Sequence, residues 1–270
     1  MSYYSRIFQT AEIDSTFYAN PSKGMVLGWV RNTPKNFEFS LKLPQIITHK
    51  KQLDLSAGAE VDLVEFLDLI DPLREAGKLG PILIQLPPSF SHNKMDRLQE
   101  FMSAVRLRRK DESKFRFAIE FRNKSWLKEP DQVNDLLSRF NVARTVVDEP
   151  LLPIDLTPTA DFTFIRWHGR GQRPWYNYRY SNEEIEPWVL RIRAEANNSK
   201  RKIYGYFNNH FHGYAVENSL EFLEELKIAT PEQHKALTGV KECIEGKRKI
   251  TDLGTPEAKL PPGQMTLGEY

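Results

Sequence analysis

The stretch Phe117-Ala-Ile-Glu-Phe-Arg122 decides the fold, because large apolar residues occupy every second position. Successive side chains of a β-strand point to opposite faces, so Glu120 and Arg122 lie on the face opposite the large apolar residues. The stretch therefore predicts a buried strand that brings charged groups to one face near its end.

Six further apolar runs along the chain follow the same alternation. The polar residues that it selects are Glu12 and Asp14, Ser40 and Lys42, Gln85, Asp148, Arg166 and His168, and Tyr206 and Asn208. Helical periodicity separates these runs, over residues 23–32, 60–76, 94–107, 131–140, 182–197, 216–226 and 232–244. Alternating strands and helices favour a parallel sheet. We expect an α/β fold, a TIM-type parallel (β/α) barrel, with the polar residues at the C-terminal strand ends.

Composition restricts the class of protein. With 270 residues, 40% of them hydrophobic and 27% charged, the chain suits one barrel domain. The net charge of +2 predicts no strong overall attraction to nucleic acid or to a membrane surface. The single cysteine, Cys243, excludes an internal disulfide and fits a reducing compartment. Because there is also no apolar run long enough to span a bilayer and no signal peptide, we expect a cytoplasmic protein.

The domain boundary lies near the C-terminus. Residues 1–253 are expected to form the barrel domain, since no linker or repeat divides them. Residues 254–270 form an extended Pro-rich tail, because Gly254-Thr-Pro-Glu-Ala-Lys-Leu-Pro-Pro-Gly263 has no apolar face.

Several blocks of sequence, in order, resemble the YecE-like family, a domain of unknown function with a TIM-barrel fold. The blocks are Glu12-Ile-Asp-Ser-Thr-Phe-Tyr18, Phe39-Ser-Leu-Lys-Leu-Pro44, Ile84-Gln-Leu-Pro-Pro88, Ala118-Ile-Glu-Phe-Arg-Asn-Lys-Ser-Trp126, Phe164-Ile-Arg-Trp-His-Gly-Arg170 and Tyr206-Phe-Asn-Asn-His210. The resemblance implies the barrel for most of the chain. It implies less about activity, because likeness of fold is a weak guide to function.

The chain departs from that family at its start. Members open with a glycine-rich strand and a helix, whereas here Met1 stands eleven residues before Glu12. Either the true start lies upstream, or the barrel has about seven strands and lacks the first. In the second case we expect the tail, residues 248–253, or a partner chain to cover the open edge.

The polar residues at the strand ends have mixed charge and two interpretations. Buried charges must pair, so a purely structural ion network plugging the barrel is one of them. A ligand site is the other, and we favour it because polar groups this dense at strand ends commonly serve a ligand. The loops after the last two strands add glycines and cations that suit phosphate or carboxylate, although an ordinary turn remains the alternative.

Within this set, two residues are expected to carry acid–base chemistry: Glu120, oriented by Arg122, and His168, whose ordinary pKa lies near neutrality. The expected ligand-binding residues are Glu12, Lys42, Gln85, Arg122, Asn123, Asp148, Arg166, Arg170, Tyr206, Asn208, Asn209 and His210. No nucleotide fingerprint or other cofactor motif occurs. A divalent metal is a lesser alternative, because His210 and His212 have no specific ligand spacing.

The last seven residues contain a second motif. Gln264, Leu267 and Tyr270 are spaced like the anchors of peptides that bind sliding clamps, although a second aromatic usually follows. They are candidate partner-binding residues, and an unremarkable tail is the alternative.

Three functions follow from these features. The leading hypothesis is an enzyme that acts on an anionic, phosphate-bearing ligand, nucleic acid included, by acid–base chemistry, with a phosphoester hydrolase as the favoured reaction. The second is a non-catalytic module that binds nucleic acid or a metabolite and recruits a partner through its tail. The third is a sugar-directed isomerase or hydrolase using paired carboxylates such as Glu12 and Glu120.

Overall fold

Strands alternate with helices along the chain in the computed structural model, which describes residues 1–108, 115–172 and 174–247. The strands are β1 (Thr10–Ile13), β2 (Glu38–Lys42), β3 (Leu79–Gln85), β4 (Phe117–Glu120), β5 (Val142–Arg144), β6 (Val146–Asp148), β7 (Phe162–Trp167) and β8 (Lys202–Phe207). The α-helices are α1 (Tyr4–Ile7), α2 (Ser15–Tyr18), α3 (Lys23–Arg31), α4 (Ala59–Glu75), α5 (Met95–Arg108), α6 (Pro130–Arg139), α7 (Asn182–Asn198), α8 (Tyr214–Glu225) and α9 (Pro231–Ile244). A π-helical turn, η1 (Ile46–Lys50), and three 3₁₀ turns, η2 (His92–Lys94), η3 (Lys124–Leu127) and η4 (Phe211–Gly213), complete the set.

All strand pairs are parallel and follow the order of the chain. One sheet has the order β1-β2-β3-β4-β5 and the other the order β6-β7-β8. Only Thr145 separates β5 from β6, and its backbone N–H donates to the carbonyl of Ile119 in β4 at 2.8 Å. The two sheets therefore continue into each other as one curved series of strands.

The series does not close. Among the described residues β1 pairs only with β2, and β8 pairs only with β7. The closed TIM barrel expected from the sequence is therefore not shown in the described residues, whose parallel strands form one sheet of five and one of three. Side chains connect the two ends instead, since the Tyr206 hydroxyl bonds those of Thr10 at 2.8 Å and Ser40 at 2.7 Å. At this open side, β1 and β8 approach each other without a shared hydrogen-bond ladder.

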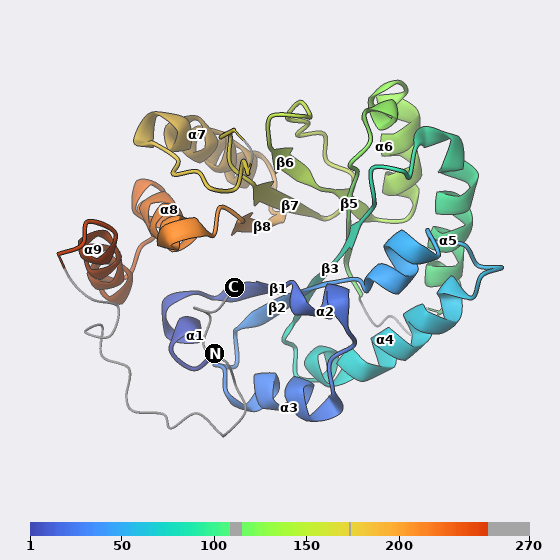
Figure 1. Ribbon diagram of the computed structural model, residues 1–270, viewed down its shortest axis with the longest axis horizontal. Coiled ribbons are helices and arrows are strands. Elements are labelled where there is room, and N and C mark those ends of the chain that lie inside the picture. The colour runs from blue at the N-terminus through green and yellow to red at the C-terminus, as the bar shows by residue number, and fades with distance from the viewer. Residues whose placement is uncertain (109–114, 173, 248–270) are drawn as a thin grey trace.

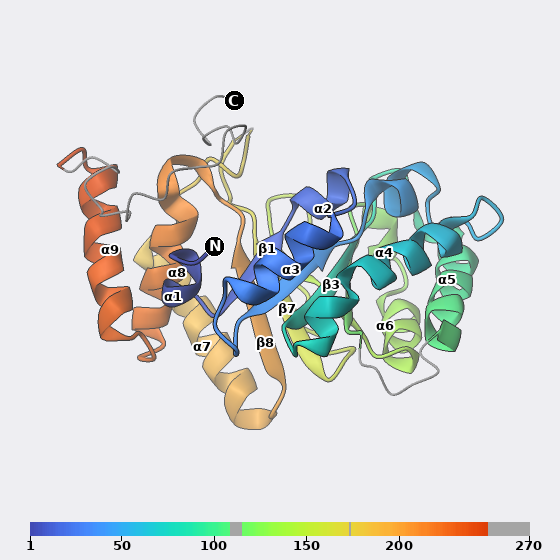
Figure 2. The same ribbon diagram turned by 90° about the horizontal axis from the view of Figure 1, so that it is seen from below.

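Helices α3 to α8 surround the strands on the outside, as Figure 1 shows. Helix α9 packs against α8 and α1 and stands at one end of the molecule in the side view (Figure 2). Between strands and helices lie two apolar cores, one around Phe39, Phe66 and Phe101, and one around Trp167 and Trp188. A third cluster fills the space inside the curved strands, and its members are Leu83, Ala118, Ala143, Phe162, Phe164, Tyr204 and Tyr206.

The helical pattern of the sequence is confirmed to within about two residues at each end, a usual margin of assignment. Helix α9 begins where Thr230 accepts a hydrogen bond from the Gln233 N–H, with Pro231 in the first turn. The short α1, α2 and η1 were not foreseen, because four or five residues carry no readable period.

Three expectations concern the C-terminus. They are that residues 248–253 cover the open edge, that residues 254–270 extend from the barrel, and that Gln264, Leu267 and Tyr270 bind a partner. All of these positions lie outside the described residues, so each stays a prediction.

Candidate functional site

Charged side chains from separate strands meet at the C-terminal ends of the strands. Each comes from a position whose neighbours along the strand pack outward on the helices, so alternation turns it inward. The residues are Glu12 of β1, Lys42 of β2, Gln85 of β3, Glu120 of β4, Arg122 after β4, and Arg166 and His168 at the end of β7. The convergence expected from the sequence is present for these seven residues.

Arg166 lies at the centre of this network. Its Nη2 donates to Glu12 Oε1 at 2.5 Å and its Nη1 to Glu120 Oε2 at 2.8 Å. At most 4% of any of these three side chains is exposed. Burial alone would lower the pKa of Arg166, but the two carboxylates raise it above its ordinary value, so the guanidinium stays charged.

Glu120 is held by several donors at once. Its Oε1 accepts from Gln85 Nε2 at 2.8 Å, and it also forms an ion pair with Arg122. Burial acts to raise the pKa of Glu120, but the charges of Arg122 and Arg166 outweigh it and hold that pKa well below the ordinary value. A carboxylate held ionised in this way is a poor proton carrier and a good anchor for guanidinium groups.

Glu149, which the sequence reading missed, is a member of the network. Arg122 Nη1 donates to its carboxylate at 2.5 Å. Asp148 was expected here instead, but it points outward and accepts from Trp188 Nε1 of α7 at 2.8 Å. The alternation of β5 and β6 explains the error, because Val146 packs outward on α7, so that Asp148 does too. The signal in the sequence was Val146: its outward position places Asp148, two residues later, on the outward face as well. The two adjacent acidic residues, Asp148 and Glu149, gave no such indication.

His168 is neutral at physiological pH. Burial and the positive charge of Arg166 lower its pKa to about 4. Its Nε2 lies 3.1 Å from Arg122 Nη2 and 3.4 Å from Arg166 Nη1, so the unprotonated ring nitrogen can accept from these guanidinium groups. The ring therefore orients the two arginines rather than supplying a proton at neutral pH.

Glu12 differs from Glu120 in its contacts and in the direction in which its pKa is shifted. Burial raises its pKa, despite the opposing charge of Arg166, and the carboxylate of Asp14 raises it further. Its Oε2 is buried and has no hydrogen-bond partner, and the same holds for Asn208 Oδ1, although Asn208 Nδ2 lies 3.4 Å from Glu12 Oε1. Buried polar atoms without partners are uncommon in proteins and mark a place where a ligand or water binds.

Glu12 and Asn208 are among the residues that line a cavity of about 710 Å³ between β1, β8 and α8. Its polar lining includes Glu12, Asp14, Asn208 and His210, and side chains of α8 and β8 form much of the apolar lining. Its volume is within the range of small-molecule sites. Of the seven network residues, Glu12 is the one that belongs to this lining.

Lys42 is the least firmly paired cation of the network. Its Nζ lies 3.7 Å from Asp14 Oδ1, and 55% of the Asp14 side chain is exposed. The same Nζ stands 4.1 Å from the centre of the Phe17 ring. Burial lowers the pKa of Lys42, so an anion bound beside it would recover part of the electrostatic cost of its charge.

Four expected ligand-binding residues lie apart from the network. Arg170 pairs with Asp148 through two hydrogen bonds of 2.8 Å. Asn123 accepts from the Ser125 N–H at 2.9 Å and begins η3. Asn209 is buried and donates to the carbonyl of Tyr178 at 2.8 Å. For these residues the contacts with neighbouring loops and strands favour a structural role.

Two further expected residues lie at the borders of the network. Tyr206 is buried below it, among hydroxyl groups of β1 and β2. His210 is exposed at the rim, where its Nδ1 lies 3.0 Å from the carbonyl oxygen of Asn208 and its ring stacks on Tyr176. Both belong to the C-terminal end of β8, as expected.

No group of three or more His, Cys, Asp or Glu side chains among the described residues has an arrangement that could hold a metal ion. Within the same ranges, no helix is both long and apolar enough to cross a membrane.

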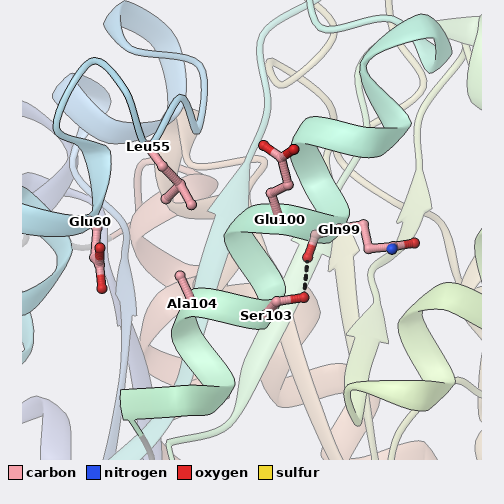
Figure 3. Close-up of a pocket in the computed structure, with 6 residues that line it drawn as sticks. All are labelled: Leu55, Glu60, Gln99, Glu100, Ser103 and Ala104. Carbon is pink, nitrogen blue, oxygen red and sulfur yellow. Dashed lines mark hydrogen bonds between the residues drawn. The ribbon is translucent and has the colours of Figure 1, made fainter.

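A second hollow of about 390 Å³ lies between α4 and α5, on the helical layer. Figure 3 shows its lining, in which Ser103 Oγ donates to the carbonyl of Gln99 at 2.8 Å within one helix. Its two carboxylates, Glu60 and Glu100, come from different helices (Figure 3). The charged network contributes nothing to it, so the site at the strand ends remains the candidate.

The parallel sheets and the helices around them define an α/β protein, with buried charges gathered at the C-terminal ends of its strands. The chain belongs to the family described as "Protein of unknown function DUF72", whose model matches residues 1–240. It is 28% identical over 247 residues to UPF0759 protein YunF of Bacillus subtilis (strain 168), covering 83% of this chain and 86% of that protein. It is 30% identical over 212 residues to UPF0759 protein YecE of Escherichia coli (strain K12), covering 70% and 72%.

Solved structures agree with this assignment. A DUF72 family protein from Enterococcus faecalis V583 superposes with a TM-score of 0.72 at 25% identity, covering 84% of this chain and 93% of that one. A DUF72 family protein from Thermotoga maritima MSB8 gives a TM-score of 0.69 at 30% identity, covering 82% and 85%. The family resemblance read from the sequence is confirmed.

Proposed function

We propose that the chain is an enzyme that acts on an anionic, phosphate-bearing ligand at the mouth, by acid–base chemistry. The observation that carries the proposal is that Lys42 and Glu12, from the neighbouring strands β2 and β1, belong to the same charged network there. Lys42 is a cation with one long ion pair, and Glu12 is a buried carboxylate with a raised pKa and an unpartnered oxygen. A cation beside a proton-exchanging carboxylate is what acid–base attack on an anion needs.

The contacts favour Glu12 as the proton carrier over the two residues first expected. A general acid or base works best when its pKa approaches the working pH. The pKa of Glu12 is raised toward neutrality, whereas those of Glu120 and His168 are lowered away from it. In this proposal Glu120 and His168 hold Arg122 and Arg166 in position.

The sugar-directed alternative rests on a different observation. Glu12 and Glu120 bind opposite ends of one guanidinium, that of Arg166, so two carboxylates with divergent pKa values share a site. Divergent carboxylates divide acid and base roles in glycosidases. A sugar phosphate would satisfy both interpretations.

The test combines binding with turnover. Calorimetric titration with inorganic phosphate should show binding to the wild-type chain that Lys42→Met abolishes. The matched control is Lys50→Met, an exposed lysine of η1. Hydrolysis of 4-nitrophenyl phosphate and bis(4-nitrophenyl) phosphate should be lost in Glu12→Gln while phosphate binding is kept.

Each other outcome has a definite meaning. Phosphate binding without turnover of any phosphoester would reject the enzyme and support the non-catalytic binding module. Turnover that survives in Glu12→Gln and disappears in Glu120→Gln would return the acid–base role to Glu120. No phosphate binding by the wild-type chain would reject the whole proposal.

A further inference from the structure

An exposed aromatic cluster, here called the aromatic platform, lies on the loops that follow β7 and β8. Its members are Tyr176, His210 and Phe211. The rings of Tyr176 and His210 are stacked, with centroids 5.3 Å apart and an interplanar angle of 16°. Phe211 packs against both rings, at 5.5 Å from Tyr176 and 5.3 Å from His210. Tyr176 is 38% exposed, and His210 is exposed as well.

Buried polar contacts hold the loop that carries Tyr176. Arg179 forms two hydrogen bonds to Glu217 of α8, whose side chain is fully buried. Asn218 accepts from the Tyr180 N–H at 3.1 Å and donates to its carbonyl at 3.0 Å. A buried carboxylate is costly unless it is well paired, and here its paired form fixes an exposed loop. These contacts attach the C-terminal end of the loop to α8.

Glycine geometry fixes the other end of the same loop. Gly169 has φ +97°, and a Cβ there would lie 2.3 Å from the carbonyl oxygen of Trp175 and 2.8 Å from Tyr178 Cβ. Only glycine permits this approach, which turns the loop back over the end of β7. Preorganisation of this kind lowers the entropy cost of binding a ligand.

The platform adjoins the charged network. β7 and β8 are neighbours, so the loops after them emerge at the same end as Glu12 and Arg166. Asn208, two residues before His210, lies 3.4 Å from Glu12, and Glu12, Asn208 and His210 line one cavity. A ligand whose anionic group sits at the network could therefore place a ring on the platform.

We propose that the ligand is a nucleotide, with its base stacked on Tyr176 and its phosphate at Lys42. This inference rests on the proposed function and names its substrate class. Aromatic side chains stack with any base through the ring face, so the platform selects a planar ring without selecting a sequence. A simple sugar phosphate has no planar ring that could stack on Tyr176.

The experiment separates the base from the phosphate. The full chain is titrated calorimetrically with AMP, ribose 5-phosphate and inorganic phosphate. Because stacking one base contributes affinity, AMP should bind roughly tenfold more tightly than ribose 5-phosphate. Tyr176→Ala should remove that preference and leave the affinity for ribose 5-phosphate unchanged, whereas Tyr176→Phe should keep it.

Two controls make the result decisive. Tyr3→Ala removes another exposed tyrosine, 52% exposed near the N-terminus, and should retain the preference for AMP. Lys42→Met should weaken AMP and ribose 5-phosphate by the same factor. If ribose 5-phosphate binds and AMP binds no more tightly, the nucleotide inference is wrong while the proposed function stands. If no phosphate compound binds at all, the proposed function itself fails.

Discussion

Ion pairs connect the first and last strands at both ends of the curved series of strands, but the two connections differ in burial. At the C-terminal end, Arg166 of β7 joins Glu12 of β1 across the open side, with both side chains at most 4% exposed. At the N-terminal end, Glu38 of β2 joins β8, accepting from the Tyr204 hydroxyl at 2.5 Å and from Lys202 Nζ at 2.7 Å. Lys202 is 55% exposed, so this second bridge lies partly in solvent.

The difference teaches which bridge is more than structural. The C-terminal ion pair joins β7 to β1, and the N-terminal one joins β8 to β2. For stability alone the solvent-exposed pair would suffice, because it costs less to desolvate. Of the two bridges, the C-terminal one alone has buried atoms without hydrogen-bond partners in the part of the chain that the structure describes. These atoms are Glu12 Oε2 and Arg166 Nε. The proposed binding role would account for these unpartnered atoms.

The largest expected effect is at the C-terminal bridge. Arg166→Met leaves Glu12 and Glu120 buried without their shared cation, and should lower the free energy of unfolding by about 3–5 kcal/mol. Urea denaturation measures the change. Arg201→Met is the matched control, because its partner Glu195 is half-buried at a helix end, and should cost under about 1 kcal/mol. A loss below about 1 kcal/mol for Arg166→Met would contradict the comparison.

The next effect is a pH dependence at the same end. Because the pKa of His168 is lowered from 6.5 to about 4, the unfolded chain binds the proton more tightly than the folded one. His168 should therefore favour the folded state above pH 6.5 and lose that contribution as the pH falls to about 4, by up to about 3 kcal/mol.

Urea denaturation at several pH values between these limits tests this, with His168→Gln compared with the wild-type chain. The variant should show a flatter dependence. Equal slopes in His168→Gln and the wild-type chain would show that His168 titrates normally.

A moderate effect is expected at the N-terminal bridge. Tyr204→Phe removes the hydroxyl that donates to Glu38 and leaves Lys202 in place, so it should cost about 1.5 kcal/mol. Thermal unfolding measures it, and Tyr3→Phe on the surface serves as control. A cost as large as that of Arg166→Met would mean that the two bridges are equally buried in energetic terms.

The smallest effect is expected from the exposed member of that bridge. Lys202→Met should change the free energy of unfolding by less than about 1 kcal/mol, because solvent screens the pair. The difference from the wild-type chain should shrink further in about 1 M NaCl. A large change that does not depend on salt would show that the N-terminal bridge behaves like the buried C-terminal bridge.

Local sequence determined much of this protein. Alternation in Phe117–Arg122 and its counterparts gave the strands, their parallel order and the inward direction of Glu120, Arg166 and Lys42, because side-chain period follows from backbone geometry alone. It failed at Asp148, where a short strand takes its phase from packing on Trp188.

The partners of the buried carboxylates and the arrangement of the first and last strands depended on the tertiary structure. That Glu12 rather than Glu120 retains an unpartnered oxygen depends on how many donors reach each carboxylate from other strands. The open side between β1 and β8, and the stack of Tyr176 on His210, join segments far apart in the chain. Sequence sets which groups face inward, and only the folded geometry sets which partners and how much water each of them has.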